Sequence, residues 1–274
     1  MQRLERAEKS PRVRRETFMA LPADSPYKLE LRNLTKSFWG RWGYLPTLED
    51  IDLRIQTGEF VSIVGPSGCG KSTLFNVIAG LEPADDGQVL LDGQDVSGQV
   101  GLFGYMLQRD LLLPWRTVLD NVILGAEIAG RDRKAARQEA RSLLPLFGLE
   151  GFADNYPATL SGGMRQRAAL LRTMLCKQEV LLLDEPFGAL DALTRAGMQK
   201  WLLEVWERFR HTVLFITHDV EEAVFLSDRV YVLTPRPARV QLELPIALSR
   251  PRPRDLVTSP AFIALKKRLL KALR

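Results

Sequence analysis

Residues 60–80 read FVSIVGPSGCGKSTLFNVIAG, and this stretch decides the fold class. It opens with an unbroken apolar run, residues 60–64, which is typical of a strand buried on both faces of a parallel sheet. Residues 71–79 resemble a helix that ends at Gly80. Between them, residues 65–72 fit the pattern G-x-x-x-x-G-K-[ST] in the strand-then-helix setting that this pattern requires. The sequence therefore predicts a phosphate-binding loop in an α/β fold.

The predicted phosphate loop offers a nucleotide three kinds of ligand. Its backbone N–H groups wrap the β- and γ-phosphates, and the start of the helix adds its dipole. Lys71 adds a full positive charge, while Ser72 offers its hydroxyl to Mg²⁺ with Thr73 behind it. The residues expected to contact the nucleotide here are Gly65, Pro66, Ser67, Gly68, Cys69, Gly70, Lys71, Ser72 and Thr73.

Two acidic residues follow a second apolar run, residues 180–183. Ligands of open parallel sheets bind at the carboxyl ends of the strands, so Asp184 is placed to hold Mg²⁺ through water. Glu185 lies one residue further along and is expected to accept a proton from an attacking water. A pair of acids after a strand is often only a helix N-cap. Pro186 and Phe187 come next, so a simple cap fits poorly here.

Two further polar side chains are expected at the ends of strands. His218 follows the apolar run 213–217 and could hydrogen-bond the γ-phosphate and hold the attacking water. Gln108 follows residues 101–107, and its amide could reach Mg²⁺ or water, although a loop glutamine is usually only solvated. The other histidine, His211, is interpreted as a structural residue.

A second anion-binding element lies at residues 160–167, which read LSGGMRQR. Ser161, Gly162 and Gly163 are expected to open a helix, whose first N–H groups and dipole attract anions. One nucleotide seldom needs two such elements in one subunit. The surplus indicates a protein that closes on ATP as a pair.

Composition and charge exclude several classes of protein. The chain has 274 residues, of which 46% are apolar, enough for a full α/β core. No stretch approaches the roughly 18 uncharged apolar residues of a membrane span, and no apolar region typical of a signal peptide follows the N-terminus. The two cysteines, Cys69 and Cys176, form no disulfide framework and suit a reducing compartment. We therefore expect a soluble, cytoplasmic protein.

The net charge of +5 is unevenly distributed along the chain. Residues 1–15 carry +4 and residues 236–274 carry +8, which leaves −7 on residues 16–235. A nucleic-acid binder would carry positive charge on its folded body. Charge at the ends favours solvated tails, with a weak attraction to anionic lipid headgroups as the alternative.

The order of the expected elements indicates the fold. Strands at 27–34, 51–55, 60–64, 88–91, 101–107, 180–183, 213–217 and 229–233 alternate with helices at 71–79, 195–209 and 220–226. Helices at 118–129, 133–147 and 162–176 interrupt this alternation. We predict an α/β, P-loop NTPase core with a mainly parallel sheet, an N-terminal antiparallel β portion and an inserted α-helical subdomain at about residues 115–165.

Outside residues 27–235, the predicted ATPase domain, we expect two basic segments. Residues 1–26 are expected to be a flexible extension. In the segment 236–274, Pro and Arg are frequent up to residue 257, and residues 262–273 could form a short amphipathic helix. That helix could contact solvent, lipid or a partner.

These motifs together resemble the ATP-binding subunit of ABC transporters from about Lys28 to Pro235. Residues 65–72 match the Walker A loop, Gln108 the Q-loop, residues 160–166 the signature and residues 180–185 Walker B. Residues 189–191 match the D-loop and His218 the switch histidine, although Gly188 stands where many members have serine. Phe38 matches the aromatic residue that stacks on adenine. Several other rings follow it, Trp39, Trp42 and Tyr44, and Trp39 is the second choice.

The resemblance implies a role for each matched residue. It implies that two subunits dock head to tail, with Ser161, Gly162, Gly163 and Gln166 of one capping the ATP held by the other. Asp191 is then also expected at the nucleotide. The residues implied in catalysis are Lys71, Gln108, Glu185 and His218, and those implied in holding Mg²⁺ are Ser72, Gln108 and Asp184.

Two stretches resemble one branch of importers. Residues 113–122, LPWRTVLDNV, and residues 187–195, FGALDALTR, look like the subunits that import nitrate, sulfonates and taurine. Residues 104–108 are also similar to relatives that import pyrimidine precursors of thiamine. The branch implies a homodimer, or a pair of paralogues, on the cytoplasmic face of the inner membrane beneath a permease that a solute-binding protein supplies. An exporter subunit, or a soluble ABC ATPase acting on nucleic acid, is the alternative.

Apolar residues around Pro114 are expected to form a groove for a partner helix, with Trp115 close to it. The alternative is that Leu111, Leu112 and Leu113 simply pack inside the helical subdomain, and we expect the loop to do both.

Overall fold

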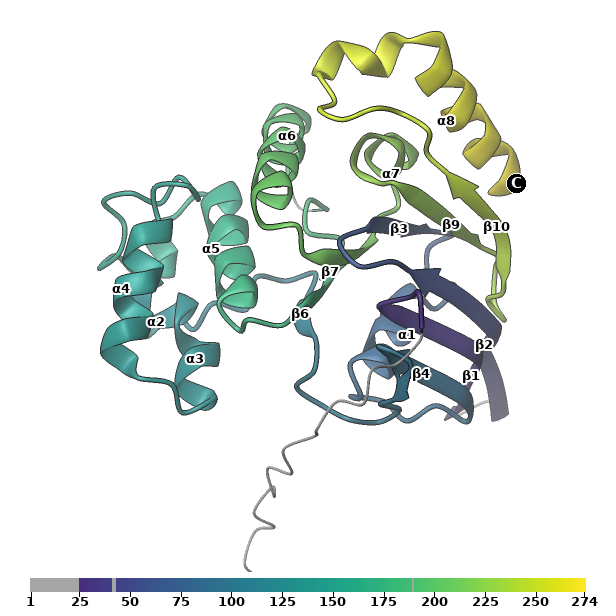
Figure 1. Cartoon of the computed structure of the whole chain (residues 1–274), viewed down its shortest axis with the longest axis horizontal. Coiled ribbons are helices and arrows are strands. Elements are labelled where there is room, and N and C mark those ends of the chain that lie inside the picture. The colour runs from purple at the N-terminus through teal and green to yellow at the C-terminus, as the bar shows by residue number, and fades with distance from the viewer. Residues whose placement is uncertain (1–24, 41–42, 189) are drawn as a thin grey trace, which may run out of the picture.

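The computed structural model describes residues 25–40, 43–188 and 190–274, so most of the predicted extension 1–26 lies outside the described residues. Two sheets organise the chain, with strand orders β2-β1-β4-β5 and β10-β9-β3-β8-β7-β6. Figure 1 shows them stacked beside a group of helices. The strands are β1 Leu29–Gly40, β2 Gly43–Ile55, β3 Phe60–Val64, β4 Asp86–Leu91, β5 Gln94–Asp95, β6 Gly104–Met106, β7 Val180–Asp184, β8 Thr212–Ile216, β9 Arg229–Leu233 and β10 Val240–Pro245.

The second sheet is mainly parallel, as the sequence predicts. Strand β3 pairs in parallel with β8 and β9, and β7 pairs in parallel with β6 and β8, while only β10 runs antiparallel to its neighbour β9. The first sheet is antiparallel throughout. Strands β3, β7 and β8 are buried along their whole length, which explains their unbroken apolar runs.

The parallel sheet separates two apolar cores. Leu181 and Leu183 of β7 point into one, which also contains the helices α5 Gly162–Met174, α6 Ala192–Phe209 and α7 Val220–Leu226. Val180 and Leu182 point into the other, where α1 Lys71–Ile78 packs between the two sheets. Side chains of a strand alternate between its faces, so one short strand contributes to both cores.

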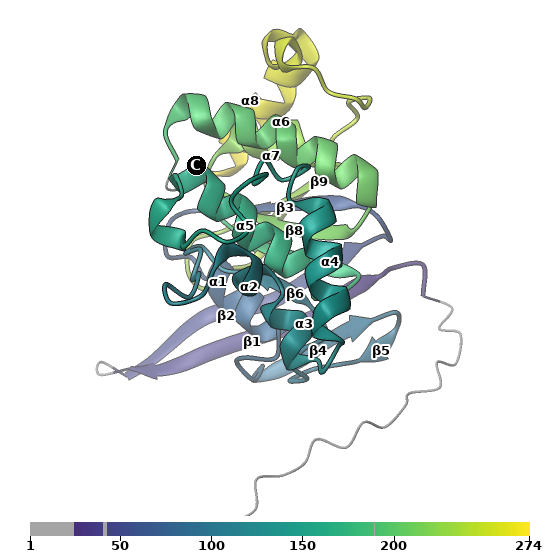
Figure 2. The same cartoon turned by 90° about the vertical axis from the view of Figure 1, so that its left-hand side faces the viewer.

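A further group of helices lies beyond the edge strand β6 (Figures 1 and 2). They are α2 Val118–Val122, α3 Leu124–Ile128, α4 Arg133–Leu143 and the 3₁₀ turn η1 Pro157–Thr159, with α5 as the link to the sheet. The single helix predicted at 118–129 is therefore wrong, because Ile123 leaves helical geometry with ψ near 0°. Gly125 then lets α3 approach the residues just after α5 closely, since a Cβ at Gly125 would lie 2.4 Å from the sulfur of Cys176.

The C-terminal segment packs against the core. It contains β10, which the sequence analysis does not predict, the 3₁₀ turn η2 Arg254–Thr258 and α8 Pro260–Ala272. Phe262 and Leu269 of α8 are fully buried, and α8 lies against α7. The preferred interpretation of 236–274 as a solvated tail is therefore wrong, because its apolar residues have a core surface to cover. None of the described helices is both long and apolar enough to cross a bilayer.

Candidate active site

The phosphate loop joins β3 to α1 at the carboxyl edge of the parallel sheet. Lys71 is buried, and its ammonium donates to the carbonyl oxygens of Gly65 at 2.9 Å and Pro66 at 3.0 Å. Gly70 has φ +126°, and a Cβ there would lie 3.0 Å from the side chains of Leu48 and Thr47. Only glycine fits that position, so the loop holds the geometry that a phosphate cradle needs.

Asp184 ends β7 beside the phosphate loop. Its carboxyl is buried, and this burial raises its pKa against the opposing effects of a hydrogen bond with Ser72 and the charge of Lys71. The hydroxyl of Ser72, the carboxylate of Asp184 and the amide of Gln108 supply the hard oxygen donors that Mg²⁺ prefers. Within the described residues no group of three or more His, Cys, Asp and Glu could hold a metal. The chemistry of Ser72, Asp184 and Gln108 fits Mg²⁺, and their role as its ligands stays a prediction.

Glu185, Gln108 and His218 meet at one carboxylate oxygen. The Gln108 amide donates to Glu185 Oε2 at 3.1 Å, and His218 Nδ1 lies 3.3 Å from the same oxygen. They follow β7, β6 and β8, which are neighbours in the sheet. The structure thus brings together three residues that the sequence places only at the ends of strands.

The backbone of Glu185 is held in an unusual conformation. Its φ of +45° is left-handed, which costs a non-glycine residue about 1 kcal/mol or more. The Glu185 N–H donates to the carbonyl of Ile216 at 3.0 Å, and the Gly188 N–H donates to the Glu185 carbonyl at 3.0 Å. Strain of this kind persists where the surroundings fix it, and it is typical of active sites.

The second anion-binding element is the N-terminus of α5. Ser161 is its N-cap and accepts from the Met164 N–H at 3.3 Å. Gln166 is buried, and its Oε1 has no hydrogen-bond partner among the described residues. Figure 1 shows α5 and α1 on opposite sides of β6 and β7.

The contacts of the aromatic residues and of the D-loop do not test the roles predicted for them. Phe38 is partly buried with the Lys36 ammonium 5.0 Å from its ring centre, while Trp39 is exposed and its ring lies 5.5 Å from that of Tyr44. Both rings therefore remain candidates for adenine, and Trp42 lies outside the described residues. Asp191 caps α6 by accepting from the N–H groups at 193 and 194, so its contact with nucleotide stays a prediction, and Ala189 also lies outside the described residues.

Comparison with known proteins decides the family. The model of the family described as "ABC transporter" matches residues 48–188. The chain belongs to the ABC transporter family. It is 46% identical to the nitrate import ATP-binding protein NrtD of Synechocystis over 80% of this chain and 83% of that one. It is 41% identical to the taurine import ATP-binding protein TauB of Escherichia coli O157:H7, over 88% and 95% of the two chains.

Two further comparisons agree. The aliphatic sulfonates import ATP-binding protein SsuB of Bacillus anthracis is 37% identical over 89% of this chain and 94% of its own. A solved dimeric bacterial ABC transporter cassette superposes with a TM-score of 0.71 at 31% identity, covering 81% of this chain and all of that one. The predicted fold, the ABC-type ATPase activity and the resemblance to the nitrate, sulfonate and taurine branch are therefore confirmed.

The sequence alone does not predict the role of Asn121, which holds a loop of this ABC cassette in place. Asn121 is fully buried, and its Oδ1 accepts from the Leu113 N–H at 2.7 Å. Its Nδ2 lies 3.0–3.1 Å from the carbonyls of Leu113, Arg116 and Thr117. The only sequence feature that marks Asn121 is its position in α2, one helical turn after the N-cap residue Thr117. Asn121 thereby fixes the loop that presents Trp115.

Different residues of the 108–117 loop fit the two predicted roles, packing inside the subdomain and contact with a partner. Leu112 is buried in the core, whereas Leu111 is exposed and Trp115 is 72% exposed. A cavity of about 550 Å³ lies beside the loop, lined by residues 108–112, Gln166 and Gly188. The loop is thus part packing element and part exposed surface, adjoining both Gln108 and the signature helix.

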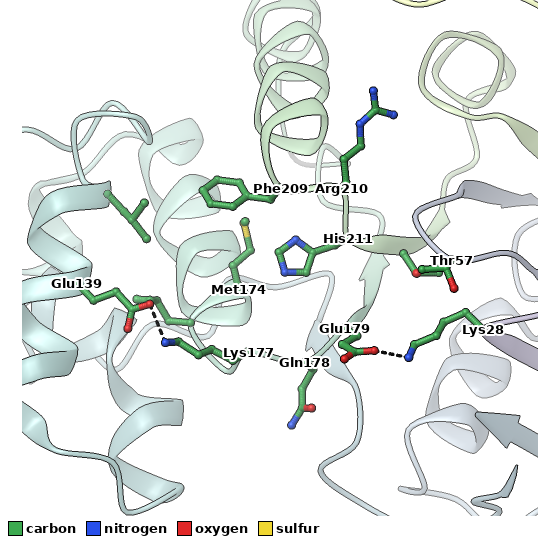
Figure 3. Close-up of a pocket in the computed structure, with 13 residues that line it drawn as sticks. Lys28, Thr57, Glu139, Met174, Lys177, Gln178, Glu179, Phe209, Arg210 and His211 are labelled. Atoms are coloured by element: carbon green, nitrogen blue, oxygen red, sulfur yellow. Dashed lines mark hydrogen bonds and ion pairs between the residues drawn. The ribbon is translucent and has the colours of Figure 1, made fainter. Parts of the chain in front are cut away.

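Another cavity, of about 410 Å³, lies at the opposite edge of the sheet (Figure 3). It is bordered by Lys177, which pairs with Glu139 at 3.0 Å, and by Glu179, which pairs with Lys28. Glu179 and Thr212 stand at the amino ends of β7 and β8. The cavity is therefore remote from the catalytic residues at the carboxyl ends.

Proposed function

We propose that the chain powers the import of a small solute, as one of two ATPase subunits beneath a membrane permease. The observation that carries this proposal is the presence of two predicted anion-binding elements, residues 65–72 before α1 and the start of α5, on helices that lie on opposite sides of β6 and β7. The names of the nitrate, sulfonate and taurine relatives support import as the direction of transport. Such a subunit lies on the cytoplasmic face of the membrane and reaches it only through the permease.

Within one subunit, the phosphate loop binds and orients ATP. Its N–H groups and Lys71 hold the phosphates, and Phe38 or Trp39 stacks on adenine. Mg²⁺, when held by Ser72, Gln108 and Asp184, neutralises charge on the phosphates.

Glu185 accepts a proton from the attacking water, and the carboxylate oxygen shared with Gln108 and His218 fixes where that water lies. His218 orients the water and contacts the γ-phosphate, so it reports whether that phosphate is present.

The second subunit completes the site. Ser161, Gly162 and Gly163 direct the N–H groups and dipole of α5 at the γ-phosphate held by the partner, and Gln166 adds an amide. ATP is then a ligand common to both subunits and favours the closed pair. Loss of the γ-phosphate on hydrolysis removes that common ligand, so the pair opens and drives the permease.

The exposed part of the 108–117 loop is the surface we assign to the permease. Trp115 supplies the large aromatic anchor that is common at the centre of interfaces, and Leu111 extends it. The 108–117 loop starts at Gln108, whose amide donates to Glu185. A short stretch of backbone therefore connects the surface assigned to the permease with the catalytic carboxylate.

Uptake in a deletion strain tests the import assignment. We expect a strain lacking this chain to lose uptake of one labelled solute among nitrate, taurine and an alkanesulfonate. The wild-type chain should restore uptake, and Lys71→Ala should not. Arg268→Ala, an exposed change on α8, is the matched control and should restore it fully. Unchanged uptake of all three solutes, with a defect in export or in nucleic-acid repair, would contradict the proposal.

A further inference from the structure

A polar cluster lies behind His218, between α6, α7 and the C-terminal segment. Its members come from three separate parts of the chain, and we name them the α6–α7 cluster: Arg195, Gln199, Thr217, Glu222 and Arg254. Gln199, Thr217 and Glu222 are all buried. Arg195 ends the stretch 187–195, and no role has been assigned above to any of the five side chains.

Hydrogen bonds connect the cluster from the C-terminal segment to the histidine. Arg254 Nη1 donates to Gln199 Oε1 at 2.8 Å, and Gln199 Nε2 donates to Glu222 Oε1 at 3.0 Å. Thr217 Oγ1 donates to Glu222 Oε2 at 2.6 Å and accepts from the Asp219 N–H at 2.9 Å. The chain of bonds therefore passes through the Thr217 side chain to the backbone N–H of Asp219, and these two residues flank His218.

The direction of each bond is fixed by chemistry. Arg254 can only donate, so it holds the carbonyl oxygen of the Gln199 amide and turns the amide nitrogen toward Glu222. The carboxylate of Glu222 then accepts from both Gln199 and Thr217. Removing the donor at one end therefore changes the bonding at the other.

Arg195 joins the D-loop to the same cluster. Its Nη2 donates to the carbonyl of Leu190 at 2.9 Å, next to Asp191. Its Nη1 lies 3.9 Å from Asp219 Oδ2 and its Nε lies 3.8 Å from Glu222 Oε1. Both segments that flank the catalytic edge, 190–191 and 217–219, thus contact one guanidinium.

His218 depends on this backbone more than on packing. Its side chain is 51% exposed, and the contact recorded for it among the described residues is the one with Glu185. A half-exposed ring keeps its place only as well as its backbone does. Apolar side chains alone would be enough to pack α6 against α7. Buried polar side chains are the costlier choice, because each one left without a hydrogen-bond partner costs about 1–3 kcal/mol.

We propose that the α6–α7 cluster positions His218 toward Glu185, so that Arg254 and the D-loop both act on catalysis through it. The cluster members are positioning residues, because none of them contacts the reacting atoms. The proposal rests on the role assigned above to His218. It gives the basic C-terminal segment a function that its charge alone does not reveal.

Gln199→Leu tests the proposal, because it keeps the size of the side chain and removes both hydrogen bonds. We expect kcat for ATP hydrolysis by the full-length chain to fall about tenfold in the wild-type background. In a His218→Ala background the same change should alter kcat by less than about twofold, because the cluster has no histidine left to position. Binding of a fluorescent ATP analogue should stay within about twofold throughout, since the phosphate loop is separate from the cluster.

A second variant and a spectrum keep the test independent of folding. Arg254→Ala should also lower kcat, and Arg254→Lys should restore part of it by returning a donor to Gln199. Arg268→Ala is the matched control, because Arg268 belongs to the same segment but is exposed on α8, whereas Arg254 contacts both Gln199 and Glu221. The chain has two histidines, so the imidazole NMR signals report directly on His218 with His211 as internal reference. Gln199→Leu and Arg254→Ala should shift the His218 signals, and Arg268→Ala should not.

These experiments distinguish the positioning role of the α6–α7 cluster from the role of His218 itself. An equal loss of kcat in both backgrounds, or unchanged His218 signals in Gln199→Leu, would overturn the positioning role. Wild-type kcat in His218→Ala alone would instead overturn the role assigned to His218.

Discussion

Replacing Arg252 by methionine should destabilise the chain strongly, although Arg252 lies far along a segment that reads as a basic tail. The side chain of Arg252 is 0% exposed. Its Nη1 donates to the carbonyls of Val224 at 3.1 Å, Phe225 at 2.9 Å and Ser227 at 2.8 Å, and its Nη2 donates to Leu248 at 3.2 Å. It therefore satisfies the carbonyls at the C-terminal end of α7, where a positive charge is favoured.

The magnitude follows from the groups left without a partner. Burial lowers the pKa of Arg252 to about 10, so the guanidinium stays charged at neutral pH and its burial has a cost. Replacing a buried ion pair with apolar residues can be neutral, because both charges leave. Here the acceptors are backbone carbonyls that no substitution removes. Nη1 has only two hydrogens for its three carbonyls, so with the bond from Nη2 about three hydrogen bonds are lost. Each loss leaves a carbonyl unsatisfied and costs about 1 kcal/mol or more, which gives about 3 kcal/mol in total.

Urea and thermal unfolding measure this loss. For a chain of this size about 3 kcal/mol corresponds to a fall in Tm of roughly 6–12 °C. Arg268→Met is the control, because it removes the same charge from an exposed site on α8 and should leave the free energy of unfolding within about 0.5 kcal/mol of wild type. If Arg252→Met were as stable as Arg268→Met, the assignment of Arg252 as the cap of α7 would be refuted.

Three other outcomes are expected. Trp115→Ala should weaken binding to the permease by about tenfold or more while leaving hydrolysis by the isolated chain unchanged, and equal binding of both proteins would disprove the loop as the contact surface. Burial raises the pKa of Glu222, so the folded chain binds that proton more tightly than the unfolded chain, and this group's contribution to stability falls as pH rises above about 4. In urea titrations Glu222→Gln should therefore gain stability relative to wild type as the pH rises above about 4, whereas a pH-independent difference would show the carboxyl to be unperturbed. Asn121→Leu should lower Tm and expose the 108–117 loop to protease, and an equally resistant loop would show that Asn121 is dispensable there.

The catalytic residues were predictable because their signals are local. A strand buried on both faces is an apolar run, and polar ligands follow it directly, so Glu185 and His218 could be placed at one edge before any contact was known. Parallel pairing of β6, β7 and β8 then brings their ends together. The meeting of Gln108 and His218 on a single oxygen of Glu185 was beyond the sequence, since it depends on side-chain directions at three strand ends.

The C-terminal segment was misinterpreted for the opposite reason. Arginines between prolines indicate solvated chain when only composition is considered, and nothing near Arg252 in sequence indicates the carbonyls that it binds. Those carbonyls belong to α7, about 25 residues away. The same holds for Arg254 and Gln199, whose partnership exists only after α6 and η2 are packed.

Paired closure on ATP is the central claim, and the oligomeric state of two variants tests it most directly. Glu185→Gln should bind ATP and hydrolyse it about 10²–10⁴-fold more slowly, so light scattering should show a stable ATP-dependent dimer. Adding Ser161→Arg should leave ATP binding intact and keep the protein monomeric, because the bulky side chain blocks the N-terminus of α5. A double variant that still dimerises with ATP would contradict the claim, as would one that loses ATP binding as a monomer, since the signature would then act within its own subunit.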